Sequence, residues 1–172
     1  MSKVHLVLPL PNHKPLVEAF IKEGKEANIE FNGSSRVEDL AYEDWLAKVY
    51  QHTFNRDVGE GRVPATTFFA FVEERLVGMI NIRHQLNPFL LQVGGHIGYM
   101  VRPSEQRKGY AKQMLKNAVE YLQQAFSIKE ILVTCSPENI GSKKTILANG
   151  GVYERTTFHP DFGKVDQYWI KR

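Results

Sequence analysis

The sequence predicts a mixed α/β (α+β) fold with a mostly antiparallel sheet, one parallel strand pair and flanking helices. Segments 66–72 and 76–84 are separated by a short charged stretch, and β-branched and aromatic residues dominate the first of them, which indicates a hairpin. Two further apolar strands, 97–101 and 131–135, are separated by a helical pattern over 110–126. A strand–helix–strand unit of this kind predicts a parallel pair with a right-handed crossover.

The remaining elements follow in order along the chain. We expect a first strand at 4–8, helices at 15–28, 37–53 and 140–148, an irregular connection at 87–95, and two last strands at 152–158 and 165–170. The chain has 172 residues, of which 42% are hydrophobic, and this is enough to bury one core. We therefore expect residues 1–172 to form a single domain.

The most informative segment leads from strand 97–101 into the long helix. Pro103 ends the strand because it has no N–H to donate to a ladder. Beyond Gly109, apolar residues recur at three- and four-residue steps and define one face of a helix. The apolar positions are Ala111, Met114, Leu115, Ala118, Val119 and Leu122.

The loop 106–111 has the properties of a phosphate-binding loop. The first turn of a helix has unpaired N–H groups and a partial positive charge, so it can hold an anion. Gly109 lets the chain pass close to a phosphate, and Arg107 and Lys108 add positive charge. Neither the Walker loop nor the dinucleotide fingerprint occurs here. A solvated basic helix start is the alternative interpretation of this loop.

Two motifs together resemble a known family. The run V-R-P-S-E-Q-R-K-G-Y-A resembles the Gln/Arg-x-x-Gly-x-Gly/Ala signature of the GNAT superfamily, the acetyl-CoA-dependent N-acetyltransferases. Residues 131–151 resemble the strand, the Asn-initiated helix and the Gly ending that complete the coenzyme A site in that superfamily. The resemblance covers about 95–151. It implies the GNAT fold, with the sheet splayed at its parallel pair, and direct acetyl transfer to a primary amine.

The resemblance also implies a set of cofactor contacts. Acetyl-CoA, the co-substrate, would be bound by Tyr99, Met100, Val101, Gln106, Arg107, Lys108, Gly109, Tyr110, Ala111, Asn139, Ser142 and Lys144. Asn139 is also a preferred helix N-cap, and the two roles are compatible. In the superfamily the strand equivalent to 97–101 bulges, and Gly98 is the position where a bulge would be tolerated. Simple relief of crowding at Gly98 is the alternative.

Two residues are candidates for catalysis. His96 lies near the position where many relatives have a basic carboxylate, and its ordinary pKa of about 6.5 suits proton acceptance. A structural histidine is the alternative. Ser142 can contact the cofactor or offer a proton to the departing sulfur. Many relatives have a tyrosine as general acid seven residues after the Asn, and here that position is Ile146. An acyl-CoA-binding sensor or interaction module with weak catalysis is therefore the alternative function.

Cysteine and membrane signals restrict the setting of the protein. A single cysteine, Cys135, cannot form an internal disulfide, and packing is the favoured role for it. No metal-ligand spacing occurs, so we expect no metal. No apolar stretch approaches the roughly 20 residues of a membrane span, and the start of the chain does not resemble a signal peptide. These features predict a cytoplasmic protein without a membrane partner.

Charge is unevenly distributed along the chain, although the net charge is only +3. Residues 1–50 have eight acids and six bases, and residues 101–172 have seven acids and twelve bases. A basic C-terminal part suits the phosphates of coenzyme A, and an acidic N-terminal part suggests attraction of a cationic amine. Glu105 interrupts the basic stretch 102–116, so we expect no nucleic-acid partner. The acceptor, a small-molecule amine or a protein amino group, is left open, and a homodimer is a further expectation.

Overall fold

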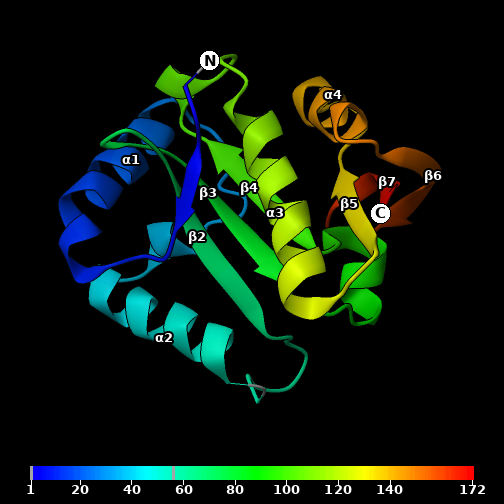
Figure 1. Ribbon diagram of the computed structural model, residues 1–172, viewed down its shortest axis with the longest axis horizontal. Helices are drawn as coiled ribbons and strands as arrows, with labels where there is room; N and C mark the ends of the chain where they lie inside the picture. Colours follow the sequence, from blue (N-terminus) through cyan, green and yellow to red (C-terminus); the bar gives the residue numbers. More distant parts are fainter. Residues whose placement is uncertain (1, 56) are drawn as a thin grey trace.

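The computed structural model, which describes residues 2–55 and 57–172, contains two antiparallel sheets (Figure 1). The first sheet has the order β1-β2-β3-β4 and the second the order β5-β7-β6. The strands are β1 (His5–Val7), β2 (Ala65–Val72), β3 (Arg75–Arg83), β4 (Ile97–Val101), β5 (Glu130–Cys135), β6 (Val152–His159) and β7 (Gly163–Lys171). The mixed α/β fold class predicted from the sequence is confirmed.

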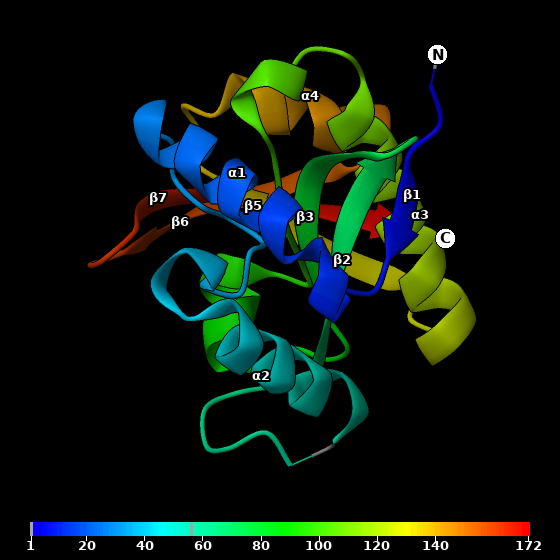
Figure 2. The same ribbon diagram turned by 90° about the vertical axis from the view of Figure 1, so that its left-hand side faces the viewer.

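Among the described residues, four α-helices flank the sheets (Figures 1 and 2). They are α1 (Lys14–Glu26), α2 (Tyr42–Phe54), α3 (Tyr110–Phe126) and α4 (Ile140–Ala148). A short 3-10 turn precedes α2, so the helix predicted over 37–53 starts later than expected. The irregular connection predicted at 87–95 contains one wide helical turn, Leu90–Gly94. Helix α3 packs on one face of the first sheet, and α1 and α2 pack on the other.

The apolar face predicted for α3 is confirmed. Met114, Leu115, Ala118, Val119 and Leu122 are all buried, and Ala111 is partly buried. These side chains pack on residues of β3, β4 and β5, so α3 holds the two sheets together. Truncation of a fully buried Leu or Met in such a core typically costs about 2–5 kcal/mol.

A second core lies under α1 and α2. Its centre is Trp45, whose ring stacks on that of Phe69 with 5.5 Å between centroids. The indole N–H of Trp45 donates to the Ser34 carbonyl oxygen at 2.9 Å, which ties the loop between α1 and α2 to this core. The loop is therefore held against the sheet rather than projecting from it.

The pairing of β4 corrects one expectation. Each residue from Ile97 to Val101 pairs with one residue of β3, so the bulge predicted at Gly98 is wrong. The irregularity of this sheet lies instead between β2 and β3, beside Ala70. The backbone of Gly33 packs on β4 at Gly98. A Cβ added to Gly33 would lie 2.7 Å from the Tyr99 Cα. Close backbone packing thus explains the glycine at position 33, whereas a Cβ at Gly98 would meet its nearest neighbours at 3.5 Å, an ordinary contact distance.

Strands β4 and β5 are joined only at their N-terminal ends, within the described residues, and diverge from there. The His96 N–H donates to the Leu132 carbonyl oxygen at 2.8 Å, and the Leu132 N–H donates to His96 Nδ1 at 2.9 Å. His96 directly precedes β4, and Leu132 lies near the start of β5, so the strands meet at their N-terminal ends. In the described part of the chain no further backbone hydrogen bond joins them. This is the splayed parallel pair that the family resemblance implied.

Candidate active site

A cleft of about 630 Å³ opens where β4 ends and α3 and α4 begin. The residues that line it are Tyr99, Val101, Glu105, Gln106, Arg107, Gly109, Tyr110, Ala111, Lys112, Asn139, Ile140, Gly141, Ser142, Lys144 and Thr145. Every predicted cofactor residue except Met100 and Lys108 is in this set. Two segments about 30 positions apart in the sequence therefore form one site, as the two motifs suggested.

The start of α3 forms one end of the cleft. Gly109 is the N-cap residue in a left-handed conformation (φ +82°), which costs other residues roughly 1–2 kcal/mol. None of the described side chains caps this helix, so the N–H groups of its first turn remain available to an anion. Lys112, which the sequence analysis did not select, also faces the cleft. These properties fit the phosphates of a nucleotide cofactor.

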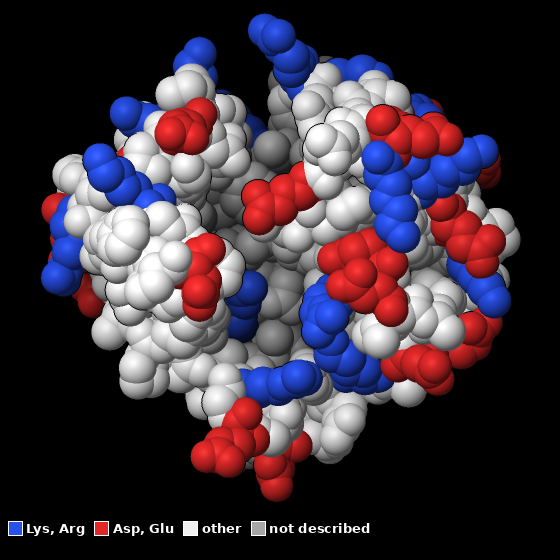
Figure 3. Space-filling model, turned by 180° about the vertical axis from the view of Figure 1, so that it is seen from behind, with Lys and Arg blue, Asp and Glu red and all other residues white. Residues whose placement is uncertain are grey.

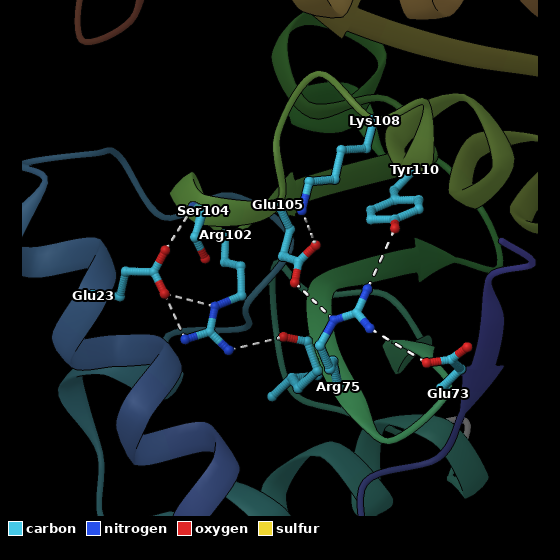
Figure 4. A network of polar contacts seen from close by, with 9 residues as sticks. Glu23, Glu73, Arg75, Arg102, Ser104, Glu105, Lys108 and Tyr110 are labelled. Atoms are coloured by element: carbon cyan, nitrogen blue, oxygen red, sulfur yellow. Dashed lines mark hydrogen bonds and ion pairs between the residues drawn. The ribbon is translucent and has the colours of Figure 1, made fainter. Parts of the chain in front are cut away.

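The loop before α3 is held by ion pairs (Figure 4). Glu23 of α1 pairs with the Arg102 guanidinium and accepts a hydrogen bond from the Ser104 N–H at 2.6 Å. Glu105 pairs through one oxygen with Arg75 at 2.9 Å, and Arg75 reaches the Tyr110 hydroxyl at 3.5 Å (Figure 4). Helix α1 and strand β3 thus fix both sides of this loop.

Two predicted cofactor residues lie outside the cleft lining. Lys108 Nζ pairs with the second Glu105 oxygen at 2.9 Å, so its charge helps to neutralise a carboxylate within the loop. The Met100 side chain is buried in the core under α1 and α2. Cofactor contacts by these two residues stay predictions. A basic residue beside a phosphate loop looks the same in sequence whether it contacts the ligand or a neighbouring acid.

The edge of β4 that faces the opening has free backbone groups. The Arg102 N–H bonds to β3, and groups on a strand alternate in direction, so Tyr99 and Val101 point their N–H and C=O groups towards the opening. The Val101 carbonyl accepts a hydrogen bond from the Gln106 side chain at 3.1 Å, in agreement with this direction. The Tyr99 N–H therefore faces the space between β4 and β5.

Two hydroxyl groups meet across the cleft. The Tyr99 and Ser142 hydroxyl oxygens are 2.8 Å apart, which joins β4 to the first turn of α4. Burial raises the pKa of Tyr99 to about 12, so this phenol keeps its proton at neutral pH. Asn139 Oδ1 accepts the Ser142 N–H at 3.0 Å, which confirms the predicted N-cap of α4. The cap thereby fixes the position of the Ser142 hydroxyl.

The position of the usual tyrosine is part of the core. Ile146 is fully buried and packs with residues of α3, β5 and β7. It also contacts Gly151, where an added Cβ would approach the Ile146 carbonyl oxygen to 2.9 Å. Thr145, its neighbour, lines the cleft instead. Tyr99, Ser142 and Thr145 are therefore residues with hydroxyl groups in the lining of the cleft.

His96 has a bonding role in this structure. Its side chain is buried, and its Nδ1 is occupied by the Leu132 N–H. Burial and, secondarily, the charge of Arg83 lower the pKa of His96 to about 4. The imidazole is therefore neutral at pH 7 and a weak base. This geometry favours the structural alternative over the predicted role as catalytic base.

The thiol of Cys135 is buried in the core. Cys135 packs in the core between α3 and the second sheet, and burial raises the pKa of its thiol. A neutral thiol is a poor nucleophile, which agrees with the packing role. Across the described residues, no three His, Cys, Asp or Glu side chains are grouped to hold a metal ion. In the same ranges, none of the helices has the length and apolar character of a membrane span.

Comparison with protein families shows to which family this chain belongs. Residues 17–152 match the family model described as an acetyltransferase (GNAT) domain. The chain belongs to the GNAT acetyltransferases. As a member of this family it is an enzyme of the class that takes an acetyl group from acetyl-CoA. The matched range includes the cleft, α3 and α4, helix α2 and all but the first three residues of α1.

Individual relatives agree with the family assignment. The chain is 26% identical over 157 residues to an uncharacterised N-acetyltransferase, YnaD of Bacillus subtilis, with 77% of this chain and 87% of that protein covered. RimJ of Mycobacterium smegmatis, in complex with a CoA-disulfide, has a TM-score of 0.75 at 16% identity, covering 98% of this chain and 81% of that one. The microcin C7 self-immunity acetyltransferase MccE, in complex with acetyl-CoA and AMP, has a TM-score of 0.72 at 15% identity, covering 100% and 94%. At these identities the two structures show the fold.

Proposed function

We propose that this GNAT acetyltransferase moves the acetyl group of acetyl-CoA directly to a primary amine. The observation that carries the proposal is the single cleft in which the uncapped start of α3, the open edge of β4 and the start of α4 meet. A ligand with phosphates at one end and a thioester at the other matches this order of groups. The acceptor is a small-molecule amine or a protein amino group.

The cofactor contacts follow from the lining of the cleft. The pyrophosphate lies at the N-terminus of α3, against the backbone of 109–111, with Arg107 and Lys112 able to approach its oxygens. The pantetheine arm follows the open edge of β4 and passes Asn139. The thioester then lies in the opening between β4 and β5, beside the Tyr99–Ser142 hydroxyl pair. These assignments combine the geometry with the family resemblance.

The chemistry needs two kinds of help at this point. The thioester oxygen gains negative charge when the amine attacks, and the Tyr99 N–H faces the space where that oxygen would lie. The departing thiolate is a group of pKa about 8.5, so one hydrogen bond from the Tyr99 or Ser142 hydroxyl stabilises it well. An amine with a pKa of about 10 must lose a proton before it attacks. With His96 bound to Leu132 and weakly basic, we assign that proton to water rather than to His96.

One experiment separates transfer from mere binding. Free thiol is measured after the protein is mixed with acetyl-CoA and each member of a panel of primary amines, and CoA binding is measured by calorimetry on the same sample. Thiol release that depends on an amine supports the transferase. Tight CoA binding without release on any amine favours the alternative, an acyl-CoA sensor, for which the buried Ile146 at the usual acid position is the supporting observation.

The setting of the enzyme is also a proposal. We propose a cytoplasmic protein with one GNAT domain over 1–172, because acetyl-CoA is the co-substrate and both motifs belong to one cleft. A homodimer stays a prediction. Strand β6, the outer strand of the second sheet, exposes apolar side chains such as Tyr153 and Phe158. Analytical ultracentrifugation at several concentrations tests whether two copies associate.

A further inference from the structure

A second pocket, of about 270 Å³, lies on the face of the first sheet that α2 covers. Its basic lining residues are Arg36, Lys48, His52, Arg62 and Arg83, and none of its lining residues is Asp or Glu. The volume is slightly below the usual range for drug-sized ligands, so the pocket suits one small chemical group. Figure 3 shows a groove on this side of the molecule, with Lys and Arg side chains gathered around its lower part.

The positive charges in this pocket repel one another. Burial lowers the pKa of Lys48, and the charges of Arg62 and Arg36 lower it further, although Glu38 acts in the opposite direction. His52 has a lowered pKa for the same reasons, with burial first and Lys48 and Arg62 next. Because like charges held together destabilise one another, an anion in their midst would relieve the repulsion.

Most of these cations lack a carboxylate partner. Within 2–55 and 57–172, Arg36 forms an ion pair with Asp39 at 3.2 Å, whereas no ion pair is formed by Lys48, Arg62 or Arg83. Lys48 donates to the Ser35 carbonyl at 3.2 Å. The neighbouring acid Glu38 is itself bonded to the Ser34 hydroxyl. Positive charge in the pocket is therefore only partly neutralised by the protein.

Arg83 anchors the inner end of the pocket. Its guanidinium donates to the carbonyl oxygens of Gly94 and Gly95, at 3.1 and 3.4 Å. Burial lowers its pKa to about 10, so it keeps its charge at neutral pH. A guanidinium held only by neutral carbonyl groups retains most of its attraction for an anion.

Strand β4 runs between Arg83 of the pocket and the cofactor cleft. Tyr99 lines the cofactor cleft, and the preceding Gly98 faces Arg83, whose two terminal nitrogens lie 3.5 Å from the place of a Gly98 Cβ. Because successive residues of a strand point to opposite faces, a group bound beside Arg83 lies on the other side of β4 from the Tyr99 side chain, and an acceptor anchored there would reach the proposed thioester through the opening between β4 and β5. That arrangement suits the two ends of a small acceptor molecule.

We propose that this pocket binds an anionic group, a carboxylate or a phosphate, on the small-molecule amine that receives the acetyl group. This inference rests on the proposed acetyl transfer to an amine. It reverses the attraction for a cationic amine suggested by the acidic N-terminal part of the sequence, because Lys48 and Arg36 from that part line the pocket, whereas its acids Glu38 and Asp39 lie beside these cations but outside the lining. Polyamines and other polycations would be repelled here.

The first test needs no turnover. Thermal unfolding is followed with saturating CoA present, so that the phosphate loop of the cofactor cleft is occupied, and with inorganic phosphate or acetate added at constant ionic strength. We expect the melting temperature of the wild type to rise with at least one of the two anions. The K48Q/R62Q double variant should lose the rise, whereas Lys22→Gln on α1, an exposed lysine outside the pocket, should retain it. No rise in the wild type, or an equal rise in the double variant, overturns the proposal.

The second test measures acceptor preference. Matched amines that differ in one charge are compared by thiol release, as in 6-aminohexanoate against 6-aminohexanamide and 3-aminopropyl phosphate against 3-aminopropanol, over chains of two to six carbons. The anionic member should have a kcat/KM about tenfold higher or more. The K48Q/R62Q variant should bring this ratio close to one while its affinity for CoA stays unchanged. The carboxylate and phosphate series show which anion is preferred.

The outcomes of the two tests distinguish this inference from the proposed function. Anion-dependent stabilisation through Lys48 and Arg62 without acetylation of any amine keeps the anion site and contradicts the proposed transfer. Acetylation with a preference for neutral or polycationic amines, or with a ratio that the double variant does not change, keeps the transferase and overturns the anion site.

Discussion

The hydroxyl oxygens of Tyr99 and Ser142 lie 2.8 Å apart and join β4 to α4 across the cofactor cleft. They come from positions 43 residues apart, and the usual tyrosine position on α4 is occupied by the buried Ile146. The structure thus offers hydroxyl donors beside the proposed thioester from β4 and from the first turn of α4, rather than from the usual tyrosine position.

Removal of these donors should slow the chemical step. We expect Tyr99→Phe and Ser142→Ala each to lower kcat by up to about 100-fold, at the low end of proton-transfer catalysis because a thiolate is a good leaving group. Since the two groups form one pair, the double variant should lose less than the product of the single losses. Steady-state kinetics measures kcat, and calorimetry checks that the Kd for CoA changes little. Unchanged kcat in all three variants would exclude the pair from the reaction.

Gly109→Val should abolish cofactor binding. The branched side chain would lie where the backbone must approach the phosphates, and the left-handed conformation at φ +82° costs a further 1–2 kcal/mol, roughly, in the free energy of unfolding. The matched control is Gly163→Val at the first residue of β7, at φ +71° with open space around it. Both variants should lose stability in urea unfolding, but only the first should lose CoA affinity in calorimetry. Equal affinity in both variants would contradict the loop assignment.

His96 should make stability depend on pH. Its pKa is about 4 in the folded protein and 6.5 in the unfolded chain, so between these values the unfolded chain binds more protons. Its contribution to stability is complete above pH 6.5 and is lost as the pH falls towards 4, by at most about 3 kcal/mol. The pKa values of His13, His52 and His84 are also lowered, so the useful quantity is the difference between the wild type and His96→Asn.

Urea unfolding between pH 4.5 and 7.5 measures that difference. The His96→Asn variant can still accept the Leu132 N–H but does not titrate, so its unfolding free energy should change less steeply over this interval. Exposed His5, mutated to Asn in the same way, serves as the control and should behave like the wild type. A His96→Asn variant with the wild-type slope would show that the imidazole is not held neutral.

Cys135→Ala should leave the reaction intact. The thiol is buried and its pKa is raised, so it is protonated at neutral pH and unsuited to attack a thioester. We expect a kcat/KM within about threefold of the wild type, a change well below 1 kcal/mol in barrier. Mass spectrometry after mixing with acetyl-CoA should detect no acetylated enzyme. A covalent acetyl group lost in the Ala variant would instead indicate a nucleophilic cysteine.

The sequence predicted the elements whose signals are local. The apolar face of α3, the N-cap at Asn139 and the glycine at position 109 each depend on residues within a few positions, and all three appear in the structure. Element boundaries were less accurate. The strand predicted over 76–84 starts one residue earlier, at Arg75, and the helix predicted over 37–53 begins only at Tyr42.

Long-range contacts were the part that the sequence did not show. The proposed anion pocket combines side chains from α2 and β3 with others that precede α2, lie between these elements or follow β3, so no short spacing indicates it. The hydrogen bonds between His96 and Leu132 join residues 36 positions apart. The ion pair between Lys108 and Glu105 depends on how the loop folds back. The bulge expected at Gly98 came from the family pattern, whereas in the structure β4 pairs regularly with β3 at this point.

Calorimetric titration of the folded wild-type protein with CoA tests the central claim most directly. The account predicts a saturable heat with one CoA per chain, and loss of that heat in Gly109→Val but not in Gly163→Val. Absence of any heat at millimolar CoA, with the protein shown to be folded by its cooperative unfolding, would contradict a cofactor cleft at the start of α3.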